Sequence, residues 1–228
     1  MATPLHTIAA EIVRCRACPR LVAWREEVAR TKRRAYLAET YWGRPVPGFG
    51  DPAARIVLVG LAPGAHGANR TGRMFTGDGS GDFLYAALHR AGLASRAASA
   101  GRDDGLVLRR AFVTNACRCV PPGNHPAPGE LARCAPFLDR ELAALPRLAV
   151  VVALGAVAWK AALGALARAG HAVPRPAPRF GHGAALSLPG APALLGSYHP
   201  SRQNTQTGRL TPAMLDAVLA RALALSRG

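Results

Sequence analysis

The spacing of apolar residues along the chain predicts strands that alternate with helices. Short apolar runs bounded by Gly or polar residues are typical of buried parallel strands, and they occur at 55–60, 111–115, 148–155, 183–189 and 193–198. Apolar residues recur at helical spacing in 4–14, 81–93, 130–145, 156–170 and 210–228. In such an alternation the helices cover both faces of a shared parallel sheet.

We therefore expect one α/β domain over residues 1–228, with a central, mostly parallel four-stranded sheet flanked by helices. Residues 55–228 would form the α/β core, and residues 1–54 the N-terminal helices and a cysteine-bearing segment. Charged residues, Gly and Pro are frequent in 19–54, which predicts a helix followed by a long loop. The sequence contains no internal repeat and no clear linker.

Three loops rich in chemically useful side chains follow predicted strands, at 61–81, 115–122 and 198–209. In open α/β sheets the ligand crevice lies beyond the carboxyl ends of the strands. One site can therefore collect residues from all three loops.

Charge and apolar content narrow the class of partner. The chain of 228 residues has 29 Lys and Arg against 13 Asp and Glu, a net charge of +16. A field of that sign attracts polyanions, most commonly nucleic acid, although a solvated basic surface is the alternative. The sequence has neither a long uncharged apolar run nor a signal-peptide pattern. We expect a cytoplasmic protein with DNA or RNA as its partner and no membrane contact.

The first and last of these loops carry different chemistry. The loop at 61–81 lacks the Gly-Lys-Ser/Thr ending of a phosphate-binding loop. Phe75 within it either stacks on a base or anchors the loop to the core. The loop at 198–209 contains side chains that can bind phosphates, base edges or a developing anion: His199, Ser201, Arg202, Gln203, Asn204 and Arg209.

Five cysteines without a secretion signal argue against a disulfide scaffold. Cys15 and Cys18 form a CxxC pair, and Cys117, Cys119 and Cys134 follow at irregular spacing. Structural zinc sites usually use two CxxC-like pairs, whereas iron–sulfur ligation tolerates irregular spacing. Zinc, an iron–sulfur cluster, redox chemistry and reduced core thiols all remain open from the residues alone.

Three ordered motifs together resemble one family. GLAPGAHGANRTGRMFTGD at 60–78, VTNACRCVPPGN at 113–124 and HPSRQNTQTGRLT at 199–211 are similar to the uracil-DNA glycosylase superfamily, specifically its family 5 or B type. The resemblance extends from Cys15 to about Pro212. It implies a monofunctional DNA-repair glycosylase that flips a nucleotide out of the duplex. Hydrolysis of the N-glycosidic bond would remove uracil and leave an abasic site.

The resemblance also implies a structural [4Fe–4S] cluster on Cys15, Cys18, Cys119 and Cys134, which ties the N-terminal segment to the core. Cys117 is then not a ligand. The DNA-contacting residues implied are Arg70, Arg73, Ser201, Arg202, Gln203, Asn204 and Arg209.

For the flipped base, the resemblance implies that Phe75 stacks on it, Asn115 bonds its edge, and His199 donates to its O2. Gly60, Ala62 and Gly64 would line the base pocket. Better-known branches have a polar residue at the position of Ala62 to place the attacking water. We expect Asn69, or failing that Asp78, to orient the water instead.

A pocket without a carboxylate in the first motif should be permissive, so we expect removal of hypoxanthine as well as uracil. The main alternative is a non-catalytic iron–sulfur DNA-binding protein on the same fold. A zinc or redox protein is a further alternative, whereas the loops lack the carboxylate cluster of a metal-dependent nuclease. Flipping enzymes of this size usually act as monomers, and the sequence does not rank the substrates or the strand preference.

Overall fold

The computed structural model describes residues 3–227, and a single mixed sheet of six strands organises them. The strand order is β1-β3-β2-β4-β6-β5. The four inner strands are parallel, whereas each edge strand is antiparallel to its neighbour. The strands are β1 (Phe49–Gly50), β2 (Ile56–Gly60), β3 (Ala111–Asn115), β4 (Val150–Leu154), β5 (Ala185–Leu186) and β6 (Ala193–Ser197).

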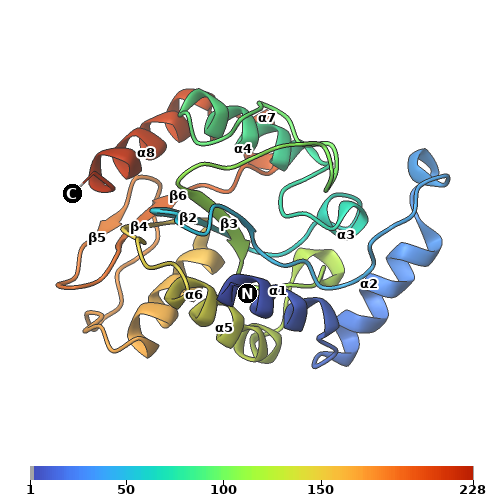
Figure 1. The fold of residues 1–228 in the computed structure, drawn as a ribbon, viewed down its shortest axis with the longest axis horizontal. Coiled ribbons are helices and arrows are strands. Elements are labelled where there is room, and N and C mark those ends of the chain that lie inside the picture. Colours follow the sequence, from blue (N-terminus) through green and yellow to red (C-terminus); the bar gives the residue numbers. More distant parts are fainter. Residues whose placement is uncertain (1–2, 228) are drawn as a thin grey trace.

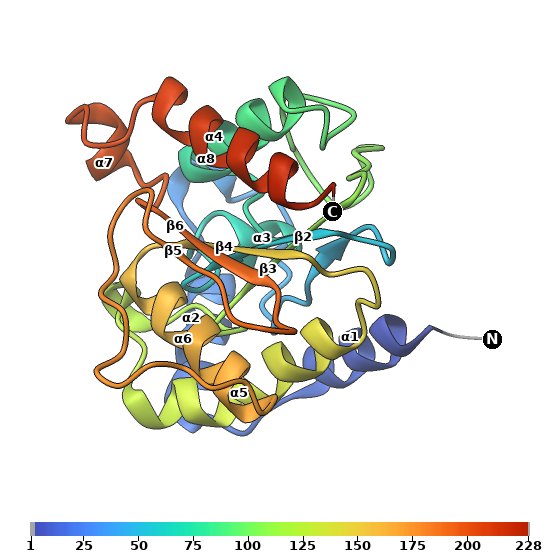
Figure 2. The ribbon, with the colours of Figure 1, turned by 90° about the vertical axis from the view of Figure 1, so that its left-hand side faces the viewer.

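Helices cover both faces of this sheet (Figures 1 and 2). One face carries α4 (Gly79–Arg90) and α8 (Pro212–Leu225), and the other carries α5 (Pro128–Ala143) and α6 (Ala156–Arg168), with α1 (Pro4–Arg14) packed on α5. The remaining helices are α2 (Pro19–Thr31), α3 (Ala68–Thr71), α7 (Arg202–Gln206) and the 3-10 turns η1 (Arg34–Tyr36) and η2 (Pro122–Asn124). No helix within residues 3–227 is long and apolar enough to cross a membrane.

The expected α/β fold is confirmed, but the sheet has six strands where we predicted four, because a two-residue antiparallel strand is added at each edge. β1 and α3 lie in segments that we predicted to be loops, as does α7. The apolar run at 183–189 contributes only the two residues of β5. A strand of two residues, or a single helical turn of four or five, is too short for a hydrophobic period to be recognised.

The inner strands are buried because both of their faces are packed. Side chains alternate along a strand, so Leu58 packs in the core beneath α4 and α8, while Val57 and Val59 pack against α5 and α6. The parallel register pairs Gly60 with Asn115 and Leu154 with Ser197. All four inner strands therefore end at one edge, where the three loops begin.

A buried ion pair joins helix α5 to the end of β3. Arg118 Nη2 donates to Glu141 Oε2 over 2.8 Å, and the two side chains are 1% and 2% exposed. The same carboxylate accepts the hydroxyl of Thr114 at 2.7 Å and the backbone N–H of Gly48 at 3.2 Å. A charge buried in this way is tolerable only while its partners remain.

We expect Glu141→Ala to lower the free energy of unfolding by about 3–5 kcal/mol, because it leaves the Arg118 guanidinium buried and unpaired. Urea denaturation measures the loss. Asp139→Ala on the same helix is the matched control, since the pair of Asp139 with Arg168 is partly exposed and is worth less than about 1 kcal/mol. Equal losses in the two variants would contradict this reading of the buried pair.

Candidate active site

Gly60, Phe75 and Asn115 meet at the carboxyl edge of the sheet. A Cβ built on Gly60 would lie 2.6 Å from Cζ of Phe75 and would clash with the Asn115 carboxamide oxygen. Only Gly lets both side chains approach the strand end this closely. Asn115 Nδ2 donates to Met74 Sδ at 2.9 Å, and its buried Oδ1 has no hydrogen-bond partner within residues 3–227. That oxygen can therefore accept a hydrogen bond from a ligand.

His199 reaches the same place from the loop after β6. Its ring centroid lies 5.9 Å from that of Phe75. Burial lowers the pKa of His199 from 6.5 to about 4, so the imidazole is neutral at pH 7 and offers one N–H. Asn204 Nδ2 donates to the His199 carbonyl at 2.8 Å, and Ser201 caps helix α7 through the backbone N–H of Asn204. These contacts fix the turn that carries the imidazole.

Phe75 has a backbone that its side chain does not favour. Its φ of +52° lies in the left-handed region, which costs a non-Gly residue on the order of 1 kcal/mol or more. Neighbouring groups hold the loop: the Tyr85 hydroxyl donates to the Met74 carbonyl at 2.8 Å, and a Cβ on Gly81 would collide with the Phe75 carbonyl. The loop is thus fixed by its surroundings and not by its own preference.

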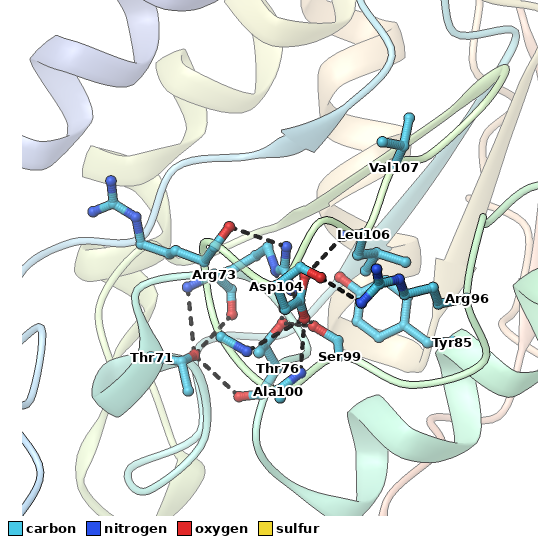
Figure 3. A network of polar contacts seen from close by, with 12 residues as sticks. Thr71, Arg73, Thr76, Tyr85, Arg96, Ser99, Ala100, Asp104, Leu106 and Val107 are labelled. Atoms are coloured by element: carbon cyan, nitrogen blue, oxygen red, sulfur yellow. Dashed lines mark hydrogen bonds and ion pairs between the residues drawn. The ribbon is translucent and has the colours of Figure 1, made fainter.

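Arg73 is part of this support (Figure 3). Its guanidinium donates to the hydroxyls of Ser99 and Thr76 at 2.7 and 3.2 Å and forms an ion pair with Asp104. The Asp104 carboxylate also accepts backbone N–H groups, and its pKa is held far below the usual value. The side chain of Arg73 is only 4% exposed, so the prediction that it contacts DNA is wrong. It ties the Phe75 loop to the 99–104 loop.

Arg70 is likewise occupied within the protein. Its guanidinium pairs with Glu39, donates to the carbonyls of His66 and Gly77, and lies 4.0 Å from the ring centroid of Tyr36. The side chain is 10% exposed. The prediction of a phosphate contact is therefore corrected for Arg70 as well, because its donors already have partners.

Asn69 and Asp78 occupy different surroundings. Asn69 is fully buried, and its Nδ2 donates to the backbone carbonyl of Arg25 in α2 at 3.3 Å. Asp78 caps α4, with Oδ1 accepting the N–H groups of Ser80 and Gly81 at 3.0 Å each. Its Oδ2 faces the first motif, where a Cβ on Gly64 would lie 2.7 Å from it. Burial raises the pKa of Asp78.

The remaining residues predicted to contact DNA lie in or next to α7. Arg202, Gln203 and Arg209 are exposed, and Arg209 lies over the Tyr198 ring at 4.8 Å. Arg202 is close to the start of α4, because a Cβ on Gly79 would be 3.3 Å from its Nε. Arg202 is therefore near Asp78, which caps the same helix, and it lowers the pKa of that carboxyl in opposition to the effect of burial.

Four of the five cysteines line one cavity, together with apolar side chains and three arginines. The four are Cys15, Cys18, Cys119 and Cys134, whereas Cys117 is absent from the lining. No group of three or more His, Cys, Asp or Glu side chains in the described part of the chain has the arrangement of a metal-ion site. Burial raises the pKa of Cys119 to about 11. A hydrogen bond with Cys117 lowers the pKa of Cys134 to about 6.

Two arginines donate hydrogen bonds to these sulfurs, and the sequence analysis did not identify either of them. Arg25 Nη1 donates to Cys119 Sγ at 3.0 Å, and Arg133 Nε donates to Cys18 Sγ at 3.3 Å. Arg25 interrupts the buried face of α2 formed by Leu21 and Val28, and this is the sequence signal for its role. Ala62 packs against the cysteine cluster, so the first motif contacts the cysteine region as well as Phe75 and Asn115 at Gly60.

Comparison with known proteins places this site in a family. A family model described as the uracil DNA glycosylase superfamily matches residues 47–223. A type-5 uracil-DNA glycosylase of Thermus thermophilus is 57% identical over 212 residues, which cover 93% of this chain and 94% of the relative. The chain belongs to the uracil-DNA glycosylase superfamily.

Relatives named type 5 match this chain over more of its length and at higher identity than relatives named type 4. The type-5 enzyme of Mycobacterium tuberculosis is 54% identical over 213 residues, covering 93% of this chain and 78% of the relative. A type-4 enzyme of Archaeoglobus fulgidus is 37% identical over 111 residues, or 48% of each chain. The predicted family assignment is thereby confirmed, and the glycosylase match spans all three loops that meet at Gly60.

Proposed function

We propose that this protein removes uracil from DNA by hydrolysing the N-glycosidic bond, as a monofunctional glycosylase of base-excision repair. The observation that carries the proposal is the convergence of Phe75, Asn115 and His199 beside Gly60. An aromatic face, an amide and an imidazole N–H at one buried point suit a planar base with polar edges. The names of the type-5 relatives support the same activity.

Asn115 reads the edge of the flipped base in this proposal. Its unpartnered Oδ1 accepts the N3–H of uracil, and Phe75 stacks on the ring. Cytosine has no proton at N3, so it would face this oxygen with a lone pair. An unmatched acceptor in a buried site costs about 1–3 kcal/mol, which disfavours the normal base.

His199 stabilises the leaving group. Departure of the base leaves negative charge on uracil, and a fixed N–H donor at O2 stabilises that charge without reorganisation. The imidazole does this in its neutral form, because burial lowers its pKa to about 4. The proton of the imidazole stays on the ring while the C–N bond breaks.

Asp78 is better placed than Asn69 to orient the attacking water. The Oδ2 of Asp78 faces the first motif at Gly64 and Gly67. Asn69 is fully buried beside α2, where its Nδ2 donates to the Arg25 carbonyl and its Oδ1 has no hydrogen-bond partner among residues 3–227. A carboxylate beside the reaction also offsets the positive charge that develops on the sugar. This reverses the order that we expected from the sequence.

The cysteine cavity suits a [4Fe–4S] cluster held by Cys15, Cys18, Cys119 and Cys134. The chemistry of the donor set fits, because four thiols from three segments line one space and arginine N–H groups address two of their sulfurs. When bound, such a cluster cross-links the N-terminal segment to the β3 loop and supplies no step of the hydrolysis. Cys117 is left as a buried neighbour of Cys134.

DNA binding is assigned to α7 and its flanks. Arg202, Gln203 and Arg209 are the exposed donors nearest His199, and phosphate contacts from such groups would position the duplex over the pocket. Ser201 and Asn204 support them by holding the turn. We propose a monomer as the active form, since the described residues of one chain hold every group of the site.

The first prediction of this proposal is uracil-dependent strand breakage. Purified protein, incubated with a duplex that carries one uracil and then treated with alkali, should cleave that strand at the uracil. His199→Ala should lower the single-turnover rate by about a hundredfold or more, because one preorganised donor is lost. Firm DNA binding by the wild type without base release would instead favour the non-catalytic DNA-binding alternative.

The second prediction separates Asp78 from Asn69. Asp78→Asn keeps a good N-cap for α4 but removes the carboxylate, and we expect it to lower the excision rate by about a hundredfold. Asn69→Ala should lower thermal stability while it changes the excision rate by less than about tenfold. The opposite pattern of rates would return the water-orienting role to Asn69.

The third prediction concerns hypoxanthine. Hypoxanthine presents N1–H beside C6=O, as uracil presents N3–H beside C4=O, so Asn115 can bond both bases in the same way. The strand-breakage assay with one deoxyinosine should therefore give cleavage, with adenine and cytosine at the same position as uncleaved controls. Release of uracil without any release of hypoxanthine would show that the pocket excludes purines by size.

The fourth prediction tests the cluster. Protein purified without oxygen should be brown, with iron and acid-labile sulfide in equal amounts, as a [4Fe–4S] cluster requires. Cys134→Ser should lose the colour, and Cys117→Ala, which removes the neighbouring non-ligand thiol, should keep it. A colourless protein that contains zinc would overturn the assignment, as would loss of the colour in Cys117→Ala with its retention in Cys134→Ser.

A further inference from the structure

A basic cleft lies at the opposite edge of the sheet from the candidate active site. It has a volume of about 380 Å³, and its lining includes Arg55, Arg110 and Arg147. Arg55 directly precedes β2, Arg110 directly precedes β3, and Arg147 lies just before β4. A five-residue strand is roughly 17 Å long, so a duplex segment seated over the pocket does not reach this cleft.

The arginines of the cleft lack carboxylate partners. Ten other arginines of the protein form ion pairs, but Arg55, Arg110 and Arg147 form none within residues 3–227. Asp51 is the one acidic side chain of the lining. Its two oxygens accept the backbone N–H groups of Ala53 at 2.8 Å and Arg110 at 2.7 Å. The cleft therefore keeps an excess of positive charge.

The backbone holds these groups in place. Arg110 has a φ of +59°, a strained conformation for a residue with a side chain. Its carbonyl accepts the N–H of Arg55 at 2.9 Å, and its Nη2 donates to Ser226 Oγ at 3.3 Å. Arg55 Nε is buried and has no acceptor among the described residues. A buried donor without an acceptor requires an explanation, and an oxyanion bound in the cleft would supply the acceptor.

We propose that this cleft binds the phosphodiester backbone of a second DNA segment. Guanidinium groups match phosphate oxygens in charge and in geometry, and the net charge of +16 draws the protein to polyanions. Free phosphate compounds share this chemistry. A protein already bound to DNA meets neighbouring duplex at far higher local concentration, which favours the duplex as the occupant. One molecule then bridges two segments.

Energy transfer between two short duplexes tests the bridge. One duplex carries a donor dye and the other an acceptor, both without uracil, and wild-type protein should bring them together. Arg110→Gln/Arg147→Gln should abolish the transfer and reduce the slope of log affinity against log salt for the second duplex by about 2. Arg30→Gln/Arg175→Gln, which removes the same charge elsewhere on the exposed surface, should retain the transfer.

The controls separate this proposal from the proposed activity. The rate of uracil release from a single short duplex should be the same in the wild type and in both double variants, because none of the four residues lies at the pocket. Absence of transfer in the wild type, or equal transfer in the cleft variant, would overturn the proposal. Stabilisation of the wild type but not the cleft variant by inorganic pyrophosphate, without transfer, would instead assign the cleft to free phosphate compounds.

Discussion

The parallel register of the four inner strands is the constraint on which the site depends. Because β2 and β3 run side by side in the same direction, Gly60 and Asn115 are paired residues at the same edge. The loop after β6 then brings His199 to that edge. No single loop contains the site, so its geometry depends on the two packed cores that hold the sheet between its helices.

Gly60 at the strand end leaves the space in which Phe75 and Asn115 come together. With any side chain at Gly60, Phe75 and Asn115 could not both approach, and Phe75 itself sits in a backbone conformation that it would not adopt alone. The cost of that conformation is offset by the buried pair of Arg73 with Asp104 and by the Tyr85 hydroxyl. The aromatic face of Phe75 is therefore held by a buried and rigid support. The buried ion pair thus stabilises the loop in which Phe75 has its strained backbone conformation.

The sequence predicted the parts of this arrangement that follow from the spacing of apolar residues and from the order of strands and loops along the chain. The short apolar runs predicted the inner strands, and the positions of the loops after them placed Phe75, Asn115 and His199 at one edge. The burial of individual charges could not be predicted from the sequence, because nothing in the local sequence distinguishes Arg70 and Arg73 from exposed arginines. Their partners, Glu39 and Asp104, lie 31 residues away in sequence. The left-handed φ of Phe75 has no signal either, since Phe does not mark such turns as Gly does.

The distribution of acidic residues decides where the positive charge of the protein acts. Most carboxylates are committed to particular arginines, such as Glu141 to Arg118 in the interior and Asp216 to Arg90 between α4 and α8. These pairs cancel charge over the helices and loops that support the fold. Unpaired arginines face solvent near α7 and at the opposite end of the sheet, without carboxylates within salt-bridge distance among residues 3–227. Others, such as Arg34 and Arg175, are exposed on the rest of the surface. The net charge of +16 therefore acts as a broad positive field that attracts polyanions. Where a polyanion settles then depends on which arginines are held in place together and lack a carboxylate partner, and not on the total charge.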